Sequence, residues 1–303
     1  MSANYCHLLP SAIEALGLPD NLRIRDILER RFITHERLND IFKYVDYLMF
    51  RPARPRAAGI VVIGEPGSGK TDLLEQLRDR YPGESARRGL IATRPTSLFS
   101  MCGVREARGL YIRMLSAFGH PEAASFTGRA REQLVLTVAR ACQLRLLLID
   151  EIQDVLKGTQ TQQTATLETL RFLMNELRVV LVVAGSEDAE LAISMDAHLS
   201  ARLKVKRLPR WEVDAYLAHF LSAMESSLPL RQVSRLHAEG TMKLIIRLTH
   251  GQTDAIVTLI ANAAAIAVES GGECITHSLL ERARNELPVL QSNEHAVEGI
   301  RHG

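Results

Sequence analysis

Eight consecutive residues have the types and spacing of a loop that holds phosphate groups. They read G-x-x-x-x-G-K-T and are Gly64, Glu65, Pro66, Gly67, Ser68, Gly69, Lys70 and Thr71. Glycines let such a loop turn its backbone N–H groups toward phosphate oxygens, and the following helix adds its positive dipole end. We expect Lys70 to reach the β- and γ-phosphates and Thr71 to hold Mg2+ through its hydroxyl. The pattern predicts a site for ATP with Mg2+, which extends to Asp72.

The flanking residues favour a real phosphate loop over a glycine-rich turn that only imitates one. Residues 59–63 are apolar and β-branched, as in a buried parallel strand. Residues 71–78 carry apolar side chains at helical spacing. The motif therefore lies between a strand and a helix, where its chemistry requires it.

A second constellation follows about 80 residues later. The apolar run 144–149 ends in Asp150 and Glu151, which is the Walker B pattern. Asp150 is expected to hold Mg2+ through water, and Glu151 to orient and deprotonate an attacking water molecule. Many strands end in charged residues, so the pair is persuasive only together with the phosphate loop.

Composition sets the broad class of the chain. It has 303 residues, 46% hydrophobic and 24% charged, with a net charge of +2. Those values are typical of a soluble globular protein, and any contact with DNA must come from local patches. The four cysteines are far apart, nothing resembles a signal peptide, and the apolar run 255–268 is too short to span a bilayer. We expect a cytoplasmic protein without a membrane, and a buried helix at 255–268.

Strands and helices alternate through the middle of the chain, which predicts an α/β fold with a parallel five-stranded sheet flanked by helices and followed by a small helical lid. The second strand is expected at 89–93, with 96–100 continuing into a short loop. Helices are expected at 105–118, 129–141 and 167–177, and the last two strands at 179–186 and 203–208. The expected domains are an N-terminal helical extension and linker at 1–57, the core at 58–208, the lid at 209–286 and a disordered tail at 287–303.

The segment before the first strand has two interpretations. Phe32 and Ile33 are candidates to cover an adenine base. Alternatively, this segment is part of an N-terminal helical region that packs on the sheet, and the sequence leaves the choice open.

Several short segments resemble one family. The order of phosphate loop, Walker B pair, polar strand end, arginine before the last strand and helical lid looks like that of the AAA+ ATPases. More particular matches to the TniB family, which is related to TnsC, lie at 31–33, 148–153, 172–177, 184–189 and 208–211, and the resemblance covers roughly residues 20–285. The more specific of these segments are Phe172-Leu173-Met174-Asn175-Glu176-Leu177 and Leu208-Pro209-Arg210-Trp211.

The resemblance implies a function. TniB-like proteins are ATP-dependent regulators of DNA transposition that assemble on DNA as a ring or filament, here expected to have roughly six or seven subunits per turn. They recruit and activate an integrase-like transposase, ATP hydrolysis reverses the assembly, and a TniQ-like targeting protein is a further partner.

The resemblance also implies roles for three positions. Ser186, at the end of a strand, would sense the γ-phosphate, although a plain strand-end turn is as good an interpretation. Arg202 would act as an arginine finger on a neighbouring subunit, against the simpler alternative of a surface arginine paired with an acid. The lid departs from the AAA+ pattern, because Asp254 stands where an arginine is common; Arg247 is a possible substitute.

Local basic and hydroxyl residues are candidates for sequence-tolerant contacts with the DNA backbone. For each residue alone, a solvated surface position is the better interpretation. The set consists of Arg94, Thr96, Ser97, Arg105, Arg108, Lys157 and Thr159.

Two other functions remain open at this point. The chain could be an ATP-switched protein scaffold of the STAND or chaperone-like kind that does not bind DNA. A P-loop kinase is weaker, because kinases of this size usually place a lid between the phosphate loop and the late strands.

Overall fold

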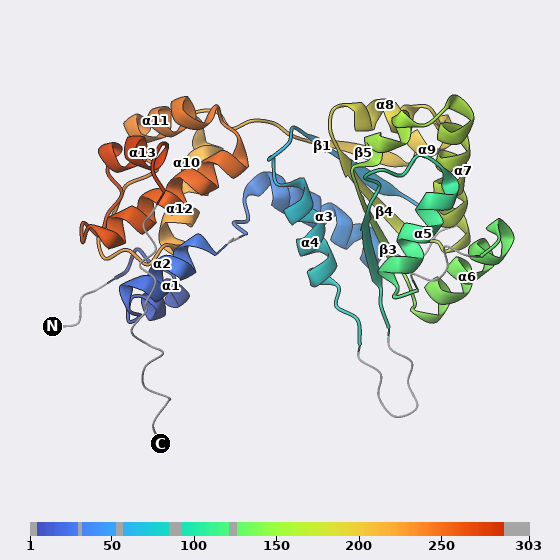
Figure 1. The fold of residues 1–303 in the computed structure, drawn as a ribbon, viewed down its shortest axis with the longest axis horizontal. Coiled ribbons are helices and arrows are strands. Elements are labelled where there is room, and N and C mark those ends of the chain that lie inside the picture. Colours follow the sequence, from blue (N-terminus) through green and yellow to red (C-terminus); the bar gives the residue numbers. More distant parts are fainter. Residues whose placement is uncertain (1–4, 30–31, 53–56, 85–92, 121–125, 288–303) are drawn as a thin grey trace, which may run out of the picture. The chain divides into compact units, whose positions relative to one another are not determined.

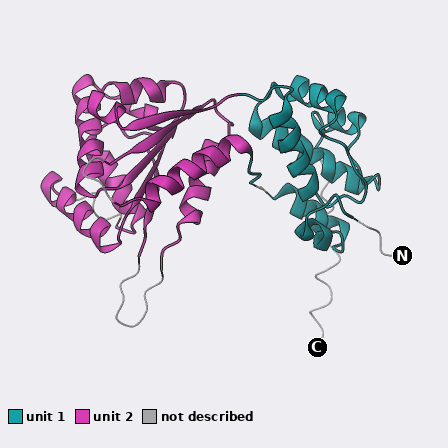
Figure 2. Ribbon diagram, turned by 180° about the vertical axis from the view of Figure 1, so that it is seen from behind, with its two compact units in different colours: residues 1–35, 210–303 teal, residues 36–209 magenta. Residues whose placement is uncertain are grey.

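The computed structural model describes residues 5–29, 32–52, 57–84, 93–120 and 126–287 (Figure 1). The chain forms two compact units, which Figure 2 shows in different colours. The lid unit joins residues 1–35 to 210–303, and the core unit spans 36–209. The expected extension 1–57 is thus divided between the two units. Of the expected tail, 288–303 lie outside the described residues.

The lid unit is helical. Its helices are α1 (Pro10–Ala15), α2 (Asp20–Leu28), α10 (Ala215–Ser227), α11 (Glu239–Thr249), α12 (Thr253–Glu269) and α13 (His277–Ala283). Trp211 is buried and stacks on Phe220, with ring centroids 4.6 Å apart. Gly251 has φ +71°, and a Cβ there would lie 2.3 Å from the carbonyl oxygen of Trp211, so this contact requires glycine. This aromatic pair is part of the larger buried core of the lid.

Helix α12 is the buried helix expected at 255–268. Residues 263–268 are all buried, and α2 packs against this helix. Among the described residues, no single helix is long and apolar enough to cross a membrane, and α11 and α12 meet that test only as a pair bent by 115°.

A buried ion pair ties α2 to the lid helices. Arg23 is fully buried, and its guanidinium donates to both carboxylate oxygens of Glu273, at 2.7 and 3.2 Å. Arg231 donates to the same carboxylate from its side chain at 2.6 Å and from its backbone N–H at 3.1 Å. This link explains why residues 5–29 belong with the lid and not with a separate extension.

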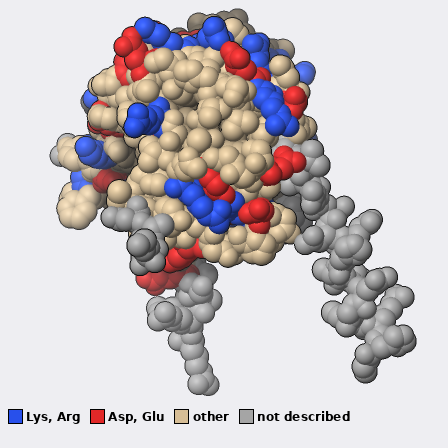
Figure 3. Space-filling view, turned by 90° about the vertical axis from the view of Figure 1, so that its left-hand side faces the viewer, with Lys and Arg blue, Asp and Glu red and all other residues tan. Residues whose placement is uncertain are grey.

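Charge on the lid unit is mixed in sign. On the face seen in Figure 3, lysine and arginine side chains alternate with acidic ones around a broad area without charge. This face therefore has no charge pattern that singles out a nucleic-acid partner.

The core unit is built on a parallel sheet. Its strands are β1 (Gly59–Gly64), β2 (Thr96–Ser100), β3 (Leu146–Asp150), β4 (Val180–Gly185) and β5 (Leu203–Leu208), in the order β2-β3-β4-β1-β5. All four pairings are parallel, which confirms the predicted fold class. The carboxyl ends of all five strands consequently meet at one edge of the sheet.

The position of the second strand differs from the prediction. The strand is Thr96–Ser100, whereas residues 89–92 of the expected strand lie outside the described residues. β2 is an edge strand in which buried and half-buried residues alternate. Its polar residues made it look like a loop, because the sequence pattern favoured a continuous apolar run of the kind found in central strands.

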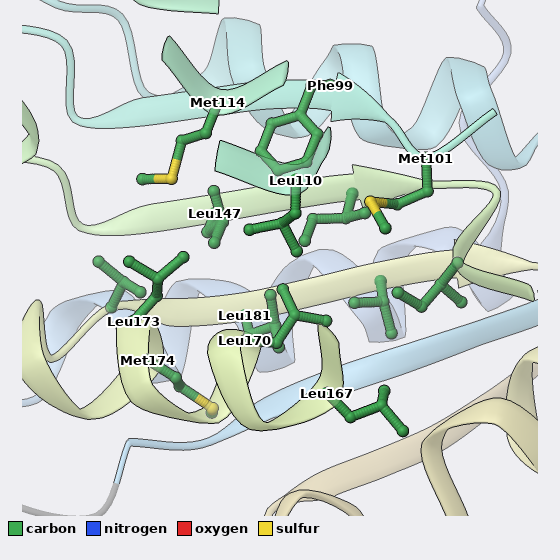
Figure 4. Packing of buried hydrophobic residues seen from close by; sticks show 14 of the residues in the cluster. Phe99, Met101, Leu110, Met114, Leu147, Leu167, Leu170, Leu173, Met174 and Leu181 are labelled. Carbon is green, nitrogen blue, oxygen red and sulfur yellow. The ribbon is translucent and has the colours of Figure 1, made fainter. Parts of the chain in front are cut away.

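Helices cover both faces of the sheet (Figure 1). One face carries α3 (Glu36–Phe50) and α4 (Lys70–Arg80), and the other carries α5 (Ala107–Ala117), α6 (Gly128–Ala141) and α7 (Gln160–Glu176). Figure 4 shows α7 side chains packed near Leu147 and Leu181 of the sheet. Short helices η2 (Ile152–Lys157), α8 (Asp188–Ser194) and α9 (Ala197–Ser200) complete the core unit.

Candidate nucleotide site

The phosphate loop lies between β1 and α4, as predicted. Gly67 and Gly69 have φ of +74° and +88°, in the left-handed region that glycine favours. At Gly64, an added Cβ would come within 2.4 Å of Ser68 Oγ, so the loop turns too tightly for a side chain there. The loop therefore has the backbone geometry that directs N–H groups inward.

Lys70 is held inside this loop. Its side chain is buried, and Nζ donates to the carbonyl oxygens of Gly64 and Glu65, both at 2.8 Å. Burial lowers the pKa of Lys70, while the nearby charges of Glu151, Asp150 and Glu65 act in the opposite direction. The ammonium is thus poised where phosphate oxygens can replace the carbonyl oxygens as its partners.

Thr71 and Asp150 meet across the sheet edge. The Thr71 hydroxyl donates to Asp150 Oδ2 at 2.7 Å, and Asp150 is buried at the end of β3. Asp72 follows in the first turn of α4. Hydroxyl and carboxylate oxygens are the ligands that Mg2+ prefers, so this pair fits the ion expected from the sequence.

Glu151 is fixed by its own backbone and by a neighbour that the sequence analysis did not single out. Its φ of +56° places it in the left-handed region, and its N–H donates to Asp150 Oδ1 at 2.9 Å. The amide nitrogen of Gln153 donates to the Glu151 carboxylate, and the amide oxygen of Gln153 accepts from the backbone N–H of Ser186 at 3.2 Å. Ser186 and Glu151 are therefore joined through one side chain.

Arg202 lies at the opposite end of the sheet from the phosphate loop. Its carbonyl oxygen accepts from the N–H of Gly59, the first residue of β1, at 3.1 Å. The six residues of β1 separate this point from the loop, a distance of roughly 20 Å. The Arg202 guanidinium donates to Asn175 Oδ1 of α7. The structure thus does not bring Arg202 to Lys70 of its own chain.

Phe32 and Ile33 belong to the lid unit. Ile33 packs against the lid core and lines a cavity of about 250 Å3, together with Asp254 and Val257 of α12. Phe32 is half-buried beside it. Arg247, the possible substitute for an arginine at 254, is exposed and forms an ion pair with Glu281 at 3.1 Å.

The candidate DNA contacts fall into two groups at opposite ends of β2. The group at its amino end consists of Arg94, Thr96 and Ser97. Ser97 is only 4% exposed, so it does not lie in the surface loop that the sequence led us to expect. At the other end, the carbonyl oxygen of Arg105 approaches Gly158. The side chain of Thr159 caps α7.

The group at the carboxyl end is organised by the buried carboxylate of Asp154. Lys157 Nζ lies 2.6 Å from Asp154 Oδ1, and the Gly103 N–H donates to Oδ2 at 2.9 Å. The hydrogen bond to Asp154 raises the pKa of Lys157. One local group therefore consists of Arg105, Lys157 and Thr159. The other three candidates, Arg94, Thr96 and Ser97, lie outside it.

Comparison with solved structures supports the fold. The Aeropyrum pernix ORC2 protein in ADPNP-ADP complexes has a TM-score of 0.65 at 16% identity, over 88% of this chain and 72% of that chain. Cdc6p from Pyrobaculum aerophilum has a TM-score of 0.56 at 14% identity, over 84% of this chain and 67% of that chain. The A. pernix ORC1 protein in complex with DNA has a TM-score of 0.54 at 15% identity, over 86% of this chain and 68% of that chain. The chain thus has the fold of these AAA+ ATPases.

Sequence comparison gives the family. The comparison with curated protein sequences finds no match. The family model described as "Bacterial TniB protein" matches residues 23–213, more than half of the chain, and this range contains the phosphate loop, the Walker B pair and Arg202. The chain belongs to the bacterial TniB family.

Proposed function

We propose that this chain is an AAA+ ATPase that hydrolyses ATP to ADP and phosphate and regulates DNA transposition. The observation that carries the proposal is the contact between Thr71 and Asp150, with Lys70 and Glu151 beside it. These four groups supply a cation, two metal-ligand oxygens and a base at one edge of the sheet. Family membership supports the transposition role.

Each residue of the site has one task in this proposal. Loop N–H groups and Lys70 hold the phosphates of ATP, while Thr71 and Asp150 hold Mg2+, which neutralises charge on the phosphate oxygens. Glu151 takes a proton from the attacking water. Ser186, at the end of β4, lies at the same sheet edge and would sense the γ-phosphate.

Two residues of the lid unit remain our candidates for contact with the base of ATP. Phe32 and Ile33 would cover one face of the adenine. Arg247 or a neighbouring subunit would supply the cation that Asp254 cannot.

DNA and protein partners complete the proposal. We infer that copies of the chain assemble on DNA as a ring or helical oligomer and contact its backbone without reading sequence. In the cytoplasm, the assembly would recruit an integrase-like transposase, with a TniQ-like protein choosing the target, and ATP hydrolysis would release it. Support comes from family membership and from a structural neighbour solved with DNA.

The test is ATP hydrolysis measured with and without duplex DNA at low salt. DNA should stimulate the rate, and Glu151→Gln should lower it about 100-fold or more while ATP still binds, because Asp150 remains. Glu187→Gln, which alters a nearby glutamate at the start of α8, is the matched control. Failure to bind DNA with hydrolysis intact would favour the protein-scaffold alternative, and a wild-type rate in Glu151→Gln would reject Glu151 as the base.

A further inference from the structure

Gln153 occupies an unusual position between two parts of the candidate site. It belongs to η2, which packs against β4 and α8. Its side chain reaches back to Glu151 of the preceding turn and across to Ser186 at the end of β4. The two contacts use both ends of a single amide group.

The orientation of this amide follows from its partners. A backbone N–H can only donate, so the Gln153 oxygen must face Ser186. The amide nitrogen then faces Glu151, whose carboxylate can only accept while it is ionised. The hydrogen-bond pattern therefore leaves no freedom to flip the amide.

The local sequence makes room for the contact. A Cβ added at Gly185 would lie 2.1 Å from the Gln153 amide oxygen and 2.9 Å from the Cβ of Ala189. Gly185 is buried and does not have a positive φ, so its need for glycine comes from this close approach and not from backbone strain. The end of β4 is thus shaped to receive Gln153.

We propose that Gln153 is a positioning residue for ATP hydrolysis, which couples the end of β4 to the carboxylate of Glu151. Through it, a movement of the Ser186 backbone is passed to Glu151 without a change in the phosphate loop. Gln153 aims the carboxylate and does not itself touch ATP. This inference rests on Glu151 being the base of the proposed function.

Two substitutions separate the contact with Glu151 from the contact with Ser186. Gln153→Leu removes both hydrogen bonds with little change in size and should lower kcat roughly 10- to 100-fold, the scale of a misplaced catalytic group, with ATP affinity unchanged. Gln153→Glu keeps an acceptor for the Ser186 N–H but removes the donor to Glu151, so it should lower kcat in the same range and again leave ATP affinity unchanged.

The split between kcat and ATP affinity is the specific readout. The two hydrogen bonds of Gln153 go to Glu151 and Ser186, so their loss should misplace the base and leave the phosphate loop as it is. Lost packing around the phosphate loop would weaken ATP binding as well.

Gln163→Glu is the matched control. The Gln163 amide donates to the carbonyl oxygens of Leu156 and Gly158, at 2.8 and 2.9 Å, so it braces the far end of η2 without touching Glu151. The same chemical change there should leave kcat nearly unchanged. Gly185→Ala is a second variant, which should displace the Gln153 amide and lower kcat, with little further loss when combined with Gln153→Ala.

The full-length chain is assayed with saturating DNA, and binding of a non-hydrolysable ATP analogue confirms that each variant is folded. The proposal is overturned if Gln153→Glu or Gln153→Leu retains the wild-type kcat. Glu151→Gln is run in parallel. If that variant hydrolyses ATP normally, the base assignment has failed; if it is inactive and the Gln153 variants are as active as the wild type, only the role of Gln153 has failed.

Discussion

The buried position of Lys70 favours the binding of phosphate and lowers the stability of the folded chain. Its ammonium is buried against carbonyl oxygens, and burial lowers its pKa below the ordinary 10.5. A lysine with a lowered pKa binds its proton less tightly in the folded chain than in the unfolded chain, so the charge opposes folding below its folded pKa. This unfavourable contribution disappears only as the pH rises through the ordinary lysine range.

Lys70→Met should therefore separate the two effects. ATP affinity should fall about 100-fold or more, because charge-assisted bonds to phosphate are lost. The melting temperature without nucleotide should stay the same or rise. Titration calorimetry with ATP and a thermal melt check both, with exposed Lys43→Met as the control. A Lys70→Met chain that binds ATP like wild type would remove the phosphate-loop assignment.

The proposed DNA contacts depend on residues at the carboxyl end of β2. Replacing both Arg105 and Lys157 by alanine should weaken binding to duplex DNA of any sequence. Plotted as log affinity against log salt, the slope should fall by about 1.8, which corresponds to two phosphate contacts. Arg94→Ala, at the other end of β2, is the comparison and should change the slope less. An unchanged slope in the double variant would contradict this placement.

Much of the nucleotide site was predictable from sequence at this scale. The spacing of Gly64 to Thr71 specifies a local backbone, and an apolar strand ending in Asp150 and Glu151 specifies the other half. The contact between Gln153 and Ser186 was not predictable, because the two residues are 33 positions apart along the chain. The same holds for Asn175 and Arg202, which are 27 positions apart. Ser97 was misjudged because burial in an edge strand is not evident from a polar sequence.

At the scale of elements, one buried ion pair holds α2 to the lid. Glu273→Gln removes the charge opposite Arg23, which is 0% exposed, and weakens the contact with Arg231. Arg23 then keeps only the exposed carboxylate of Asp20, at 3.0 Å, and the loss of its buried partner should cost about 3 kcal/mol of the unfolding free energy. Trp211 lies in the lid core and is the single tryptophan of the chain, so its fluorescence in urea reports on this unit.

The matched control for that experiment is Glu286→Gln. Glu286 pairs with Arg282 at 2.5 Å, but both side chains are about half exposed, so the urea midpoint should hardly move. If Glu273→Gln leaves the Trp211 transition where it is in the wild type, the ion pair does not secure α2.

Elements with a continuous apolar pattern were predicted well, and those with a polar start were not. β1, β3 and β4 lie close to their expected positions, because central parallel strands are buried on both faces. β5 also lies where it was expected, although it is an edge strand with exposed residues. α7 begins at Gln160, well before the expected start at Leu167, since its first two turns carry mostly polar residues. The capping box formed by Thr159 and Gln162 was a signal that would have located this start.

At the scale of the whole molecule, the division into two units depends on contacts that no local pattern carries. Arg23 and Glu273 are 250 residues apart in sequence, so the sequence could not show that the first helices pack with the lid. Arg202 raises a similar question. It lies at the amino end of the sheet, roughly 20 Å from the loop that would hold ATP in its own chain.

The distance keeps Arg202 away from the phosphates of its own subunit, and its action on a neighbouring subunit remains our proposal. A guanidinium can bridge γ-phosphate oxygens, and such a finger contributes roughly 1000-fold or more to the rate of related phosphoryl transfer. Asn175 of the Phe172–Leu177 segment holds the Arg202 side chain by a hydrogen bond, which would limit its freedom before assembly. Asn175→Ala should therefore lower hydrolysis in the same direction as Arg202→Ala, but by a smaller factor.

Mixing subunits tests whether the site is shared. Arg202→Ala should bind ATP normally yet hydrolyse it poorly on DNA. By contrast, Arg207→Ala, which alters an exposed arginine of β5 paired with Glu190 of α8, should remain active. Adding Lys70→Ala subunits, which cannot bind ATP but still offer Arg202, should restore part of the activity, because each intact phosphate loop then gains a neighbour with an arginine. The rate is measured as a function of the mixing ratio. Normal hydrolysis by Arg202→Ala alone would show that Arg202 is not the finger, and the absence of recovery in mixtures that assemble on DNA would show that it does not act between subunits.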